Sequence, residues 1–366
     1  MVSLSKLRAG VGRLTRWFQS GKTEYPDVVS IHNAHTAHQH LEEVICLRDG
    51  KTLHAGPPRE LTRHLPARQA YRLRDVHVWL DEGIVMTPGG ELVAETLPSR
   101  YRLIKRLRGG AYDMSPPPRR TMDTIDQCTS LKGGQYHGNY YHWWVDEIPR
   151  LQALHQLGET PVATVPSAYP DQLIEIIQQL APPGIQTRRA ETRNEWVHAR
   201  EFLFLPPMTA DYCGYLPEDF VANLRKNVVE EWGSDRSGPR DRRCYVSRAG
   251  GSMRRVVNEQ AVVQCLSEYG FETVQAEELS IREQVRRFSE ASWIAGPHGA
   301  GLTNMMFSID CTIVELFPGA AFTHYQWLSE SLGHDYHSIV GNPENEKNAD
   351  FEVDLSVLRK ILDECA

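Results

Sequence analysis

The chain has 366 residues, a length sufficient for two domains of ordinary size, and 41% of its residues are hydrophobic. Its 40 Lys and Arg residues against 47 Asp and Glu residues give a net charge of -7, which argues against a dedicated nucleic-acid-binding protein because such proteins usually carry a basic surface. The seven cysteines show no CxxC or Cys/His spacing, so neither a zinc site nor a disulfide framework is predicted, and the pattern is typical of reduced thiols in a cytoplasmic protein.

The first 24 residues predict a basic amphipathic helix. Apolar residues recur at helical spacing from Leu4 to Phe18, and every charge before Glu24 is positive. Such a helix would bind an anionic membrane surface through residues 1–22, although a helix docked on its own domain or a basic tail fits the same pattern. This region has no apolar run of about 18 residues and no signal-peptide core. We therefore expect a cytoplasmic protein, peripheral on the inner face of the cell membrane if the helix binds lipid.

Domain organisation is indicated by changes in composition along the chain. Residues 25–110 predict a β-rich, irregular segment, in which the alternation from Val76 to Met86 is typical of strands. The stretch 234–241 (SDRSGPRD) has the Gly, Pro, Ser and charges of a linker and cannot pack a core. We therefore predict a first domain over residues 25–235, a second domain over 240–345 and a C-terminal helical segment over 346–366.

Helices alternate with strands from about residue 140 onward. A helix is predicted from Tyr141 to a stop at Gly158, and strands are predicted in the second domain at residues 244–247, 271–274, 293–295 and 312–317. Strands that alternate with helices over short connections form parallel, doubly wound sheets. The predicted fold class is therefore α/β, and ligands are expected beyond the carboxyl ends of the second domain's strands.

The segment 296–304 (GPHGAGLTN) follows a predicted strand and opens a predicted helix. Unpaired backbone N–H groups and the helix dipole favour an anion at such a turn, and small residues let a phosphate approach the backbone. His298 is placed to donate a hydrogen bond to a phosphate oxygen or to a hydroxyl of a donor sugar. A tight turn with a core histidine is the alternative interpretation.

Charged residues near this turn favour the anion site. Arg248 ends the preceding strand and Arg254 follows it, and arginine binds diphosphate through paired hydrogen bonds. Glu315 lies in an otherwise apolar strand, where an unpaired carboxylate would be unfavourable. It would accept hydrogen bonds from the ribose hydroxyls of a nucleotide, or form a salt bridge with a nearby arginine.

Several motifs, in this order, resemble glycosyltransferase family 61. They are YHWWVDEIPRL at 141–151, YVSR at 245–248, NE at 258–259, YGF at 269–271, and the block from Trp293 through Asn304 to Phe307 and Glu315. The resemblance covers about residues 130–320. It implies a GT-B architecture, in which two Rossmann-like doubly wound domains face each other across a cleft, here with a β-rich N-terminal segment.

The resemblance further implies an inverting hexosyl- or pentosyltransferase that needs no metal or other cofactor. It would move a sugar from a nucleotide sugar, usually UDP-linked, to a hydroxyl of a glycan or lipid-linked acceptor in cell-surface polysaccharide synthesis. The first domain would bind the acceptor and the second the donor. The predicted donor-binding residues are Arg248, Arg254, His298, Gly299, Ala300, Gly301, Asn304 and Glu315. The absence of a transmembrane segment fits a bacterial-type enzyme better than a Golgi enzyme.

Inverting transfer also needs a base that takes the proton of the acceptor hydroxyl. His142 and Asp146 are the catalytic candidates, because residues four apart share a helix face and the aspartate can orient the imidazole. Glu147 is a further candidate, and a purely structural pair is the alternative interpretation. A different function also fits the sequence: a catalytically idle protein that binds a nucleotide sugar or a glycan. A metal-dependent hydrolase lacks support, because no HExxH or two-metal spacing occurs.

Overall fold

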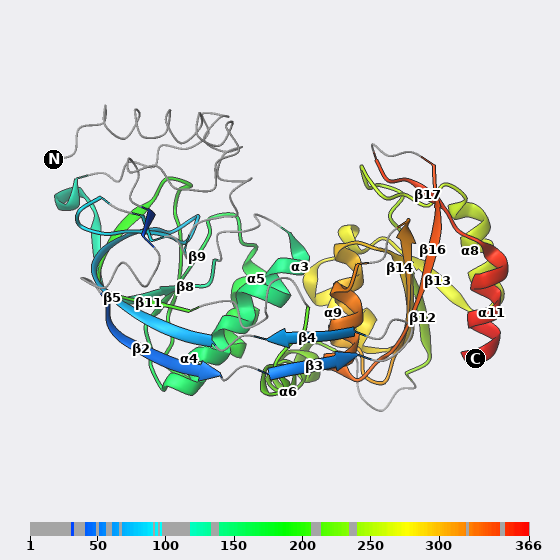
Figure 1. The fold of residues 1–366 in the computed structure, drawn as a ribbon, viewed down its shortest axis with the longest axis horizontal. Helices are drawn as coiled ribbons and strands as arrows, with labels where there is room; N and C mark the ends of the chain where they lie inside the picture. Colours follow the sequence, from blue (N-terminus) through cyan, green and yellow to red (C-terminus); the bar gives the residue numbers. More distant parts are fainter. Residues whose placement is uncertain are drawn as a thin grey trace. The chain divides into compact units, whose positions relative to one another are not determined.

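The computed structural model describes residues 31–32, 41–48, 51–55, 61–65, 68–90, 92–93, 96, 118–132, 139–205, 214–233, 240–319, 322–344 and 348–365 (Figure 1). The chain divides into two compact units. The first comprises Met1–Asp49, Ala67–Gly138 and Arg150–Pro207, and the second comprises Gly50–Pro66, Asn139–Pro149 and Met208–Ala366. The predicted N-terminal helix and most of the predicted linker 234–241 lie outside the described residues, so both stay predictions.

The first unit is built on a nine-stranded sheet with the order β1-β7-β6-β5-β11-β8-β9-β10, in which β2 also pairs with β5. Strands β11, β8, β9 and β10 run parallel, whereas β5 runs antiparallel to β11, β2 and β6. The strand bounds are β1 (Ile31–His32), β2 (Leu41–Arg48), β5 (Arg68–Trp79), β6 (Ile84–Met86), β7 (Leu92–Val93), β8 (Asp123–Ser130), β9 (Val162–Val165), β10 (Thr187–Arg189) and β11 (Trp196–Phe204).

The antiparallel strands make this sheet different from the doubly wound sheet predicted for the first domain. Strand β5 turns into β6 at Gly83, which has a φ of 65° and where an added Cβ would lie 2.4 Å from the carbonyl oxygen of Lys132. A turn this short joins only antiparallel strands. Strands β1 to β7 agree with the predicted β-rich segment. Strands β8–β11 form a parallel set whose helices include α4 (Leu151–Leu157) and α5 (Asp171–Leu180), and the short β1 and β7 also pair in parallel.

The second unit contains a six-stranded sheet with the order β13-β12-β14-β15-β16-β17. Strands β12 to β16 run parallel, as predicted for the second domain, and only the short β17 is antiparallel. In Figure 1, α8 and α11 lie on one side of this sheet and α9 on the other. The strand bounds are β12 (Arg242–Val246), β13 (Phe271–Val274), β14 (Ala291–Pro297), β15 (Thr312–Pro318), β16 (Asp335–Pro343) and β17 (Phe351–Glu352).

The helices of this unit follow from local sequence signals. Helix α9 (Ile281–Ser289) begins with the predicted capping box, in which Ser280 and Glu283 exchange hydrogen bonds. The predicted Gly-rich turn leads into a 3-10 helix, Ala300–Phe307. The other elements are α8 (Glu259–Glu268), α10 (His324–Leu332), α11 (Leu355–Cys365), a helical run made of α6 (Glu218–Leu224), a π-helical turn Arg225–Val229 and α7 (Glu230–Trp232), and a hairpin of β3 (Lys51–Ala55) and β4 (Leu61–Leu65).

The helix predicted from Tyr141 to Gly158 is confirmed, but it is not uniform. It consists of α3 (Tyr140–His142), a π-helical turn Trp143–Glu147, a short 3-10 turn and α4, and it ends at Gly158 with a φ of 66°. Although residues 139–149 fall inside the predicted first domain 25–235, they pack within the second unit. The start of this helix therefore contributes to the same compact unit as the parallel sheet.

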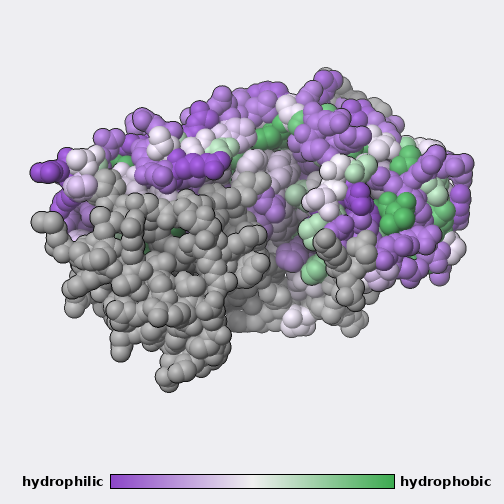
Figure 2. All heavy atoms as spheres, turned by 90° about the horizontal axis from the view of Figure 1, so that it is seen from above, coloured by the Kyte–Doolittle hydropathy of each residue, from purple (hydrophilic) through white to green (hydrophobic). Residues whose placement is uncertain are grey.

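The core of the second unit is formed by the sheet together with α8 and α11, and it includes Tyr245, Phe351 and Leu358. On the face shown in Figure 2, the described residues are mainly hydrophilic with scattered hydrophobic patches. Among the residues whose burial is described, the exposed large hydrophobic side chains are Met253, Val257, Phe322, Val340 and Val357. None of the helices among the described residues has the length and hydropathy required to cross a bilayer.

Candidate functional site

A pocket opens at the carboxyl ends of β12, β13 and β14 in the second unit, with a volume of about 370 Å³. Strand order reverses between β12 and β14, so the pocket lies at the topological switch point where doubly wound sheets bind ligands. Its volume is in the range of small-molecule sites. The lining residues are Tyr140, Val246, Ser247, Arg248, Gly250, Gly251, Ala276, Glu277, Gln284, Pro297, Gly299, Ala300 and Gly301.

The glycines of the turn after β14 are required by close packing. An added Cβ at Gly301 would lie 2.7 Å from Cγ1 of Val246, and one at Gly299 would lie 2.0 Å from Nη1 of Arg248. The backbone of Gly299 is extended, so glycine is needed there because a side chain would not fit, and not because of an unusual dihedral angle. The turn therefore packs directly on β12 and leaves room for the guanidinium group of Arg248 beside its backbone.

Two arginines bring positive charge to this region. Nε of Arg248 donates to the carbonyl oxygen of Met253 at 2.9 Å. Arg254 has a φ of 56°, which is uncommon for a residue with a side chain. Burial, and then repulsion from Arg248, lower the pKa of Arg254. Within the described part of the chain neither guanidinium forms an ion pair with a carboxylate, so both charges are available to an anionic ligand.

His298 directly follows β14 and is paired with Glu315, a fully buried residue inside β15. Nδ1 of His298 lies 2.5 Å from Oε1 of Glu315, and the hydroxyl of Tyr336 donates to Oε2 at 2.5 Å. Burial raises the pKa of Glu315 well above its ordinary value, whereas burial together with Arg254 and Arg248 lowers the pKa of His298 to about 3. When the carboxyl group is protonated it donates to Nδ1, and the imidazole then carries its proton on Nε2 as a hydrogen-bond donor.

In this geometry the carboxyl group of Glu315 contacts other side chains of the protein. The side chain is fully buried, and both of its oxygens already have partners in His298 and Tyr336. Its predicted contact with the ribose of a nucleotide stays a prediction, and in this structure both carboxyl oxygens are occupied by protein partners. Glu315 orients His298 from behind.

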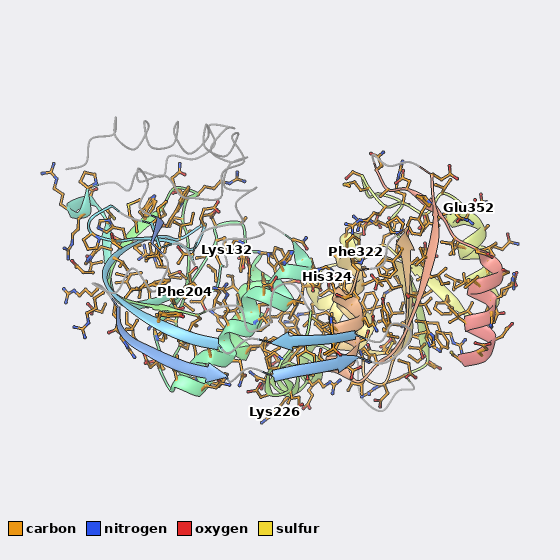
Figure 3. All side chains as sticks on the ribbon, in the orientation of Figure 1. Lys132, Phe204, Lys226, Phe322, His324 and Glu352 are labelled. Carbon is orange, nitrogen blue, oxygen red and sulfur yellow. The ribbon has the colours of Figure 1, made fainter. Side chains whose placement is uncertain are left out.

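Aromatic side chains surround His298 on its other sides. Phe322 and His324 lie close together before and at the start of α10 (Figure 3). The His298 ring centroid lies 4.9 Å from that of Phe322 and 5.4 Å from that of Tyr325. The hydroxyl of Tyr325 donates to the carbonyl oxygen of Gly299 at 2.6 Å, which ties this cluster to the Gly-rich turn.

Asn304 supports the turn from inside the protein. It is fully buried, and its side-chain amide donates to Gln284 at 2.9 Å and to the carbonyl oxygen of Gly301 at 3.0 Å. The hydroxyl of Tyr140 donates to its oxygen at 2.8 Å. Asn304 therefore positions Tyr140 and Gln284, which line the pocket, and does not line it itself.

The predicted catalytic pair is also in contact. Nδ1 of His142 is hydrogen-bonded to Oδ2 of Asp146, as expected for residues four apart on a helix. The His142 ring packs edge-on against Tyr141, and Tyr141 packs edge-on against Tyr325. Because Tyr325 contacts His298, a continuous set of aromatic contacts joins the two histidine–carboxylate pairs.

Residues 140–314 match a family model described as Glycosyltransferase 61. The similarity to glycosyltransferase family 61 therefore covers slightly less than half of the chain. The match confirms the resemblance inferred from the sequence motifs, and it spans both the segment that carries His142 and the loops that line the pocket. A search of curated proteins found no match to the chain.

The predicted donor-binding residues fall into two groups in the structure. Arg248, Gly299, Ala300 and Gly301 line the pocket, whereas the others lie behind or beside it: Arg254, His298, Asn304 and Glu315. No group of three or more His, Cys, Asp or Glu side chains within the described ranges is arranged to hold a metal ion.

Sequence reasoning missed several pocket residues, among them Tyr140, Glu277 and Gln284. Tyr140 and Gln284 carried no signal, since each reaches the pocket through tertiary contacts with Asn304. Glu277 did carry one. It follows the second strand of the doubly wound sheet, where nucleotide-binding folds place an acidic residue.

Proposed function

We propose that this chain is an inverting glycosyltransferase that moves a sugar from a nucleotide sugar, most simply a UDP-sugar, to a hydroxyl of a glycan or lipid-linked acceptor. The observation that carries the proposal is the pocket at the switch point of the second unit. There Arg248 lies against the backbone of Gly299, and Arg254 adds a second charge without a carboxylate partner among the described residues. This arrangement suits a diphosphate.

The leaving diphosphate gains negative charge as the sugar–phosphate bond breaks, and fixed donors lower the barrier by stabilising that charge. Arg248 and the backbone N–H groups of residues 299–301 would bind the phosphates directly. His298, held in one orientation by Glu315, would donate from Nε2 to a phosphate oxygen or a sugar hydroxyl. These donors supply the charge stabilisation that a metal ion provides in other transferases, so we propose a reaction without an essential metal or other cofactor.

Asp146 is the base we propose for the acceptor hydroxyl. It lies partly exposed, and its contact with His142 fixes its orientation. The base must reach the acceptor while the leaving group departs on the opposite face of the sugar. The grouping of residues 139–149 with the donor pocket in one compact unit supports this assignment.

We further propose that the acceptor is a precursor of a cell-surface polysaccharide, and that the enzyme works in the cytoplasm on the inner face of the membrane. Support for this part comes from the amphipathic pattern of residues 1–22 and their positive charges. The donor sugar, whether hexose or pentose, is set by the pocket's shape.

Binding of UDP to an Arg248→Ala variant tests the proposed function. Loss of the guanidinium from the diphosphate should weaken UDP binding by roughly a hundredfold, because hydrogen bonds to charged groups are strong. Isothermal titration of UDP, GDP and CMP, each with manganese and with EDTA, would measure this. Arg286→Ala is the matched control, since Arg286 is exposed on α9 and does not line the pocket. Equal UDP affinity in the wild type and Arg248→Ala would contradict the donor site, and UDP binding without any sugar transfer would favour the idle binding protein.

A further inference from the structure

The pocket is also lined by a negative group, which comes from a different loop than the Gly-rich turn. Glu277 lines the pocket from the loop after β13, while the turn with Gly299 follows β14. Because β12 lies between β13 and β14 in the sheet, Glu277 and the turn flank the end of β12 from its two sides. The loop after β12, which carries Arg248, runs between them.

The three loops line one pocket, and the ends of β12 and β13 are joined by a hydrogen bond from the N–H of Ser247 to the carbonyl oxygen of Val274. An added Cβ at Gly301 would lie 3.8 Å from Cβ of Ala276, which precedes Glu277. An added Cβ at Gly250 would lie 3.4 Å from Oε1 of Glu277, so the glycine leaves space beside this carboxylate. The Glu277 carboxylate is exposed and has no hydrogen bond or ion pair with another described residue.

The pocket is therefore bipolar, with a cation near the Gly-rich turn and a free carboxylate across β12. A nucleoside diphosphate has the same polarity, because its phosphates need donors and its ribose hydroxyls need acceptors. The diphosphate would lie against Arg248 and the turn, and the ribose would extend toward β13. In doubly wound nucleotide-binding sheets, an acidic residue after the second strand accepts hydrogen bonds from the ribose.

We propose that Glu277 accepts hydrogen bonds from the ribose hydroxyls of the donor nucleotide and makes this enzyme selective for ribonucleotides. The inference rests on the proposed function and adds the residue that recognises the sugar of the nucleotide. The neighbouring Glu278 is also exposed but does not line the pocket, and Glu315 is fully buried. Among the acidic residues that the structure describes, Glu277 is thus the one that lines the pocket and can accept hydrogen bonds from a ligand there.

Three probes separate the two ends of the pocket: UDP, 2′-deoxy-UDP and inorganic pyrophosphate. In the wild type, UDP should bind roughly tenfold more tightly than 2′-deoxy-UDP, because hydrogen bonds to a carboxylate are stronger than neutral ones. Glu277→Ala should abolish this preference by weakening UDP binding, and pyrophosphate binding should not weaken. Glu278→Ala removes the same charge one residue away and should keep the preference. Because both side chains are exposed, both variants should fold, which a thermal unfolding curve checks.

The outcomes distinguish this inference from the proposed function. Equal affinity of the wild type for UDP and 2′-deoxy-UDP, or an unchanged preference in Glu277→Ala, would overturn the role of Glu277 and leave the donor site intact. A wild-type protein that binds neither pyrophosphate nor any nucleotide would overturn the proposed function, and the role of Glu277 with it.

Discussion

Two histidine–carboxylate pairs in the second unit share the same chemistry in different surroundings. His142 and Asp146 lie on one helical run, and their side chains are 9% and 18% exposed. His298 directly follows β14 and Glu315 lies in the neighbouring β15, and their side chains are 12% and 0% exposed. The decisive difference is at the carboxyl group, which is accessible to solvent in the first pair and fully buried, here called sealed, in the second.

This difference assigns different work to the two carboxyl groups. An accessible carboxylate can exchange protons with a substrate, whereas a sealed one can only hold its neighbour. In the second pair the imidazole is the group nearer to the ligand, and the pKa of about 3 keeps it neutral at physiological pH. Asp146 is therefore the candidate for proton transfer, and Glu315 is a positioning residue.

Asp146→Asn should have the largest effect on turnover. Replacing the proposed base by an amide should lower kcat by about 100- to 10,000-fold, the usual contribution of general base catalysis. The affinity for UDP should stay within about twofold, because Asp146 does not line the donor pocket. Steady-state kinetics would measure kcat, and UDP titration would measure the affinity. Asp310→Asn is the control, because Asp310 lies in the loop that precedes β15 and does not line the pocket. Wild-type turnover in Asp146→Asn would remove the proposed base.

The same amide substitution should be tolerated at the sealed pair. Because burial favours the neutral form of Glu315, Glu315→Gln should change the free energy of unfolding by less than about 1 kcal/mol. Glu315→Ala should lower it by about 2–3 kcal/mol, since it leaves a cavity and removes the partner of both His298 and Tyr336. Urea unfolding would compare the variants. A Glu315→Gln variant as unstable as Glu315→Ala would show that the ionised form is required.

The first pair was predictable from sequence and the second was not, for a physical reason. Contacts between residues four apart follow from helix geometry alone, so the sequence predicts the pairing of His142 with Asp146. The pairing of His298 with Glu315 depends on β14 and β15 being neighbours in register, which no local pattern specifies. The same limit hid Tyr336, which reaches Glu315 from β16.

The fold divides in the same way. The βα units of the second unit were predicted because caps, glycine stops and apolar strands are local signals. The placement of residues 139–149 with that unit depends on tertiary contacts such as Tyr140 with Asn304, so the segment was predicted in the other domain. The antiparallel part of the first sheet likewise depends on how β5 pairs with β11.

The pH dependence of stability gives the smallest and most specific effect. Because the pKa of His298 falls from 6.5 to about 3 on folding, the unfolded chain takes up a proton below pH 6.5 that the folded protein excludes. The contribution of His298 to stability is therefore full above pH 6.5 and is lost as the pH falls toward 3. Glu315, with a raised pKa, acts in the opposite direction, since its contribution is lost as the pH rises.

Comparing the wild type with His298→Gln isolates the histidine from Glu315, which both proteins keep. As the pH falls from about 7 to about 5, the wild type should lose about 2 kcal/mol of free energy of unfolding relative to His298→Gln. It should stay constant between about pH 7.5 and 8.5, where the imidazole is neutral in both states. Urea unfolding across this range would measure the shift. If the difference in free energy of unfolding does not change between pH 7 and pH 5, folding does not lower the pKa of His298. The burial of the His298–Glu315 pair would then have no effect on the protonation of its imidazole.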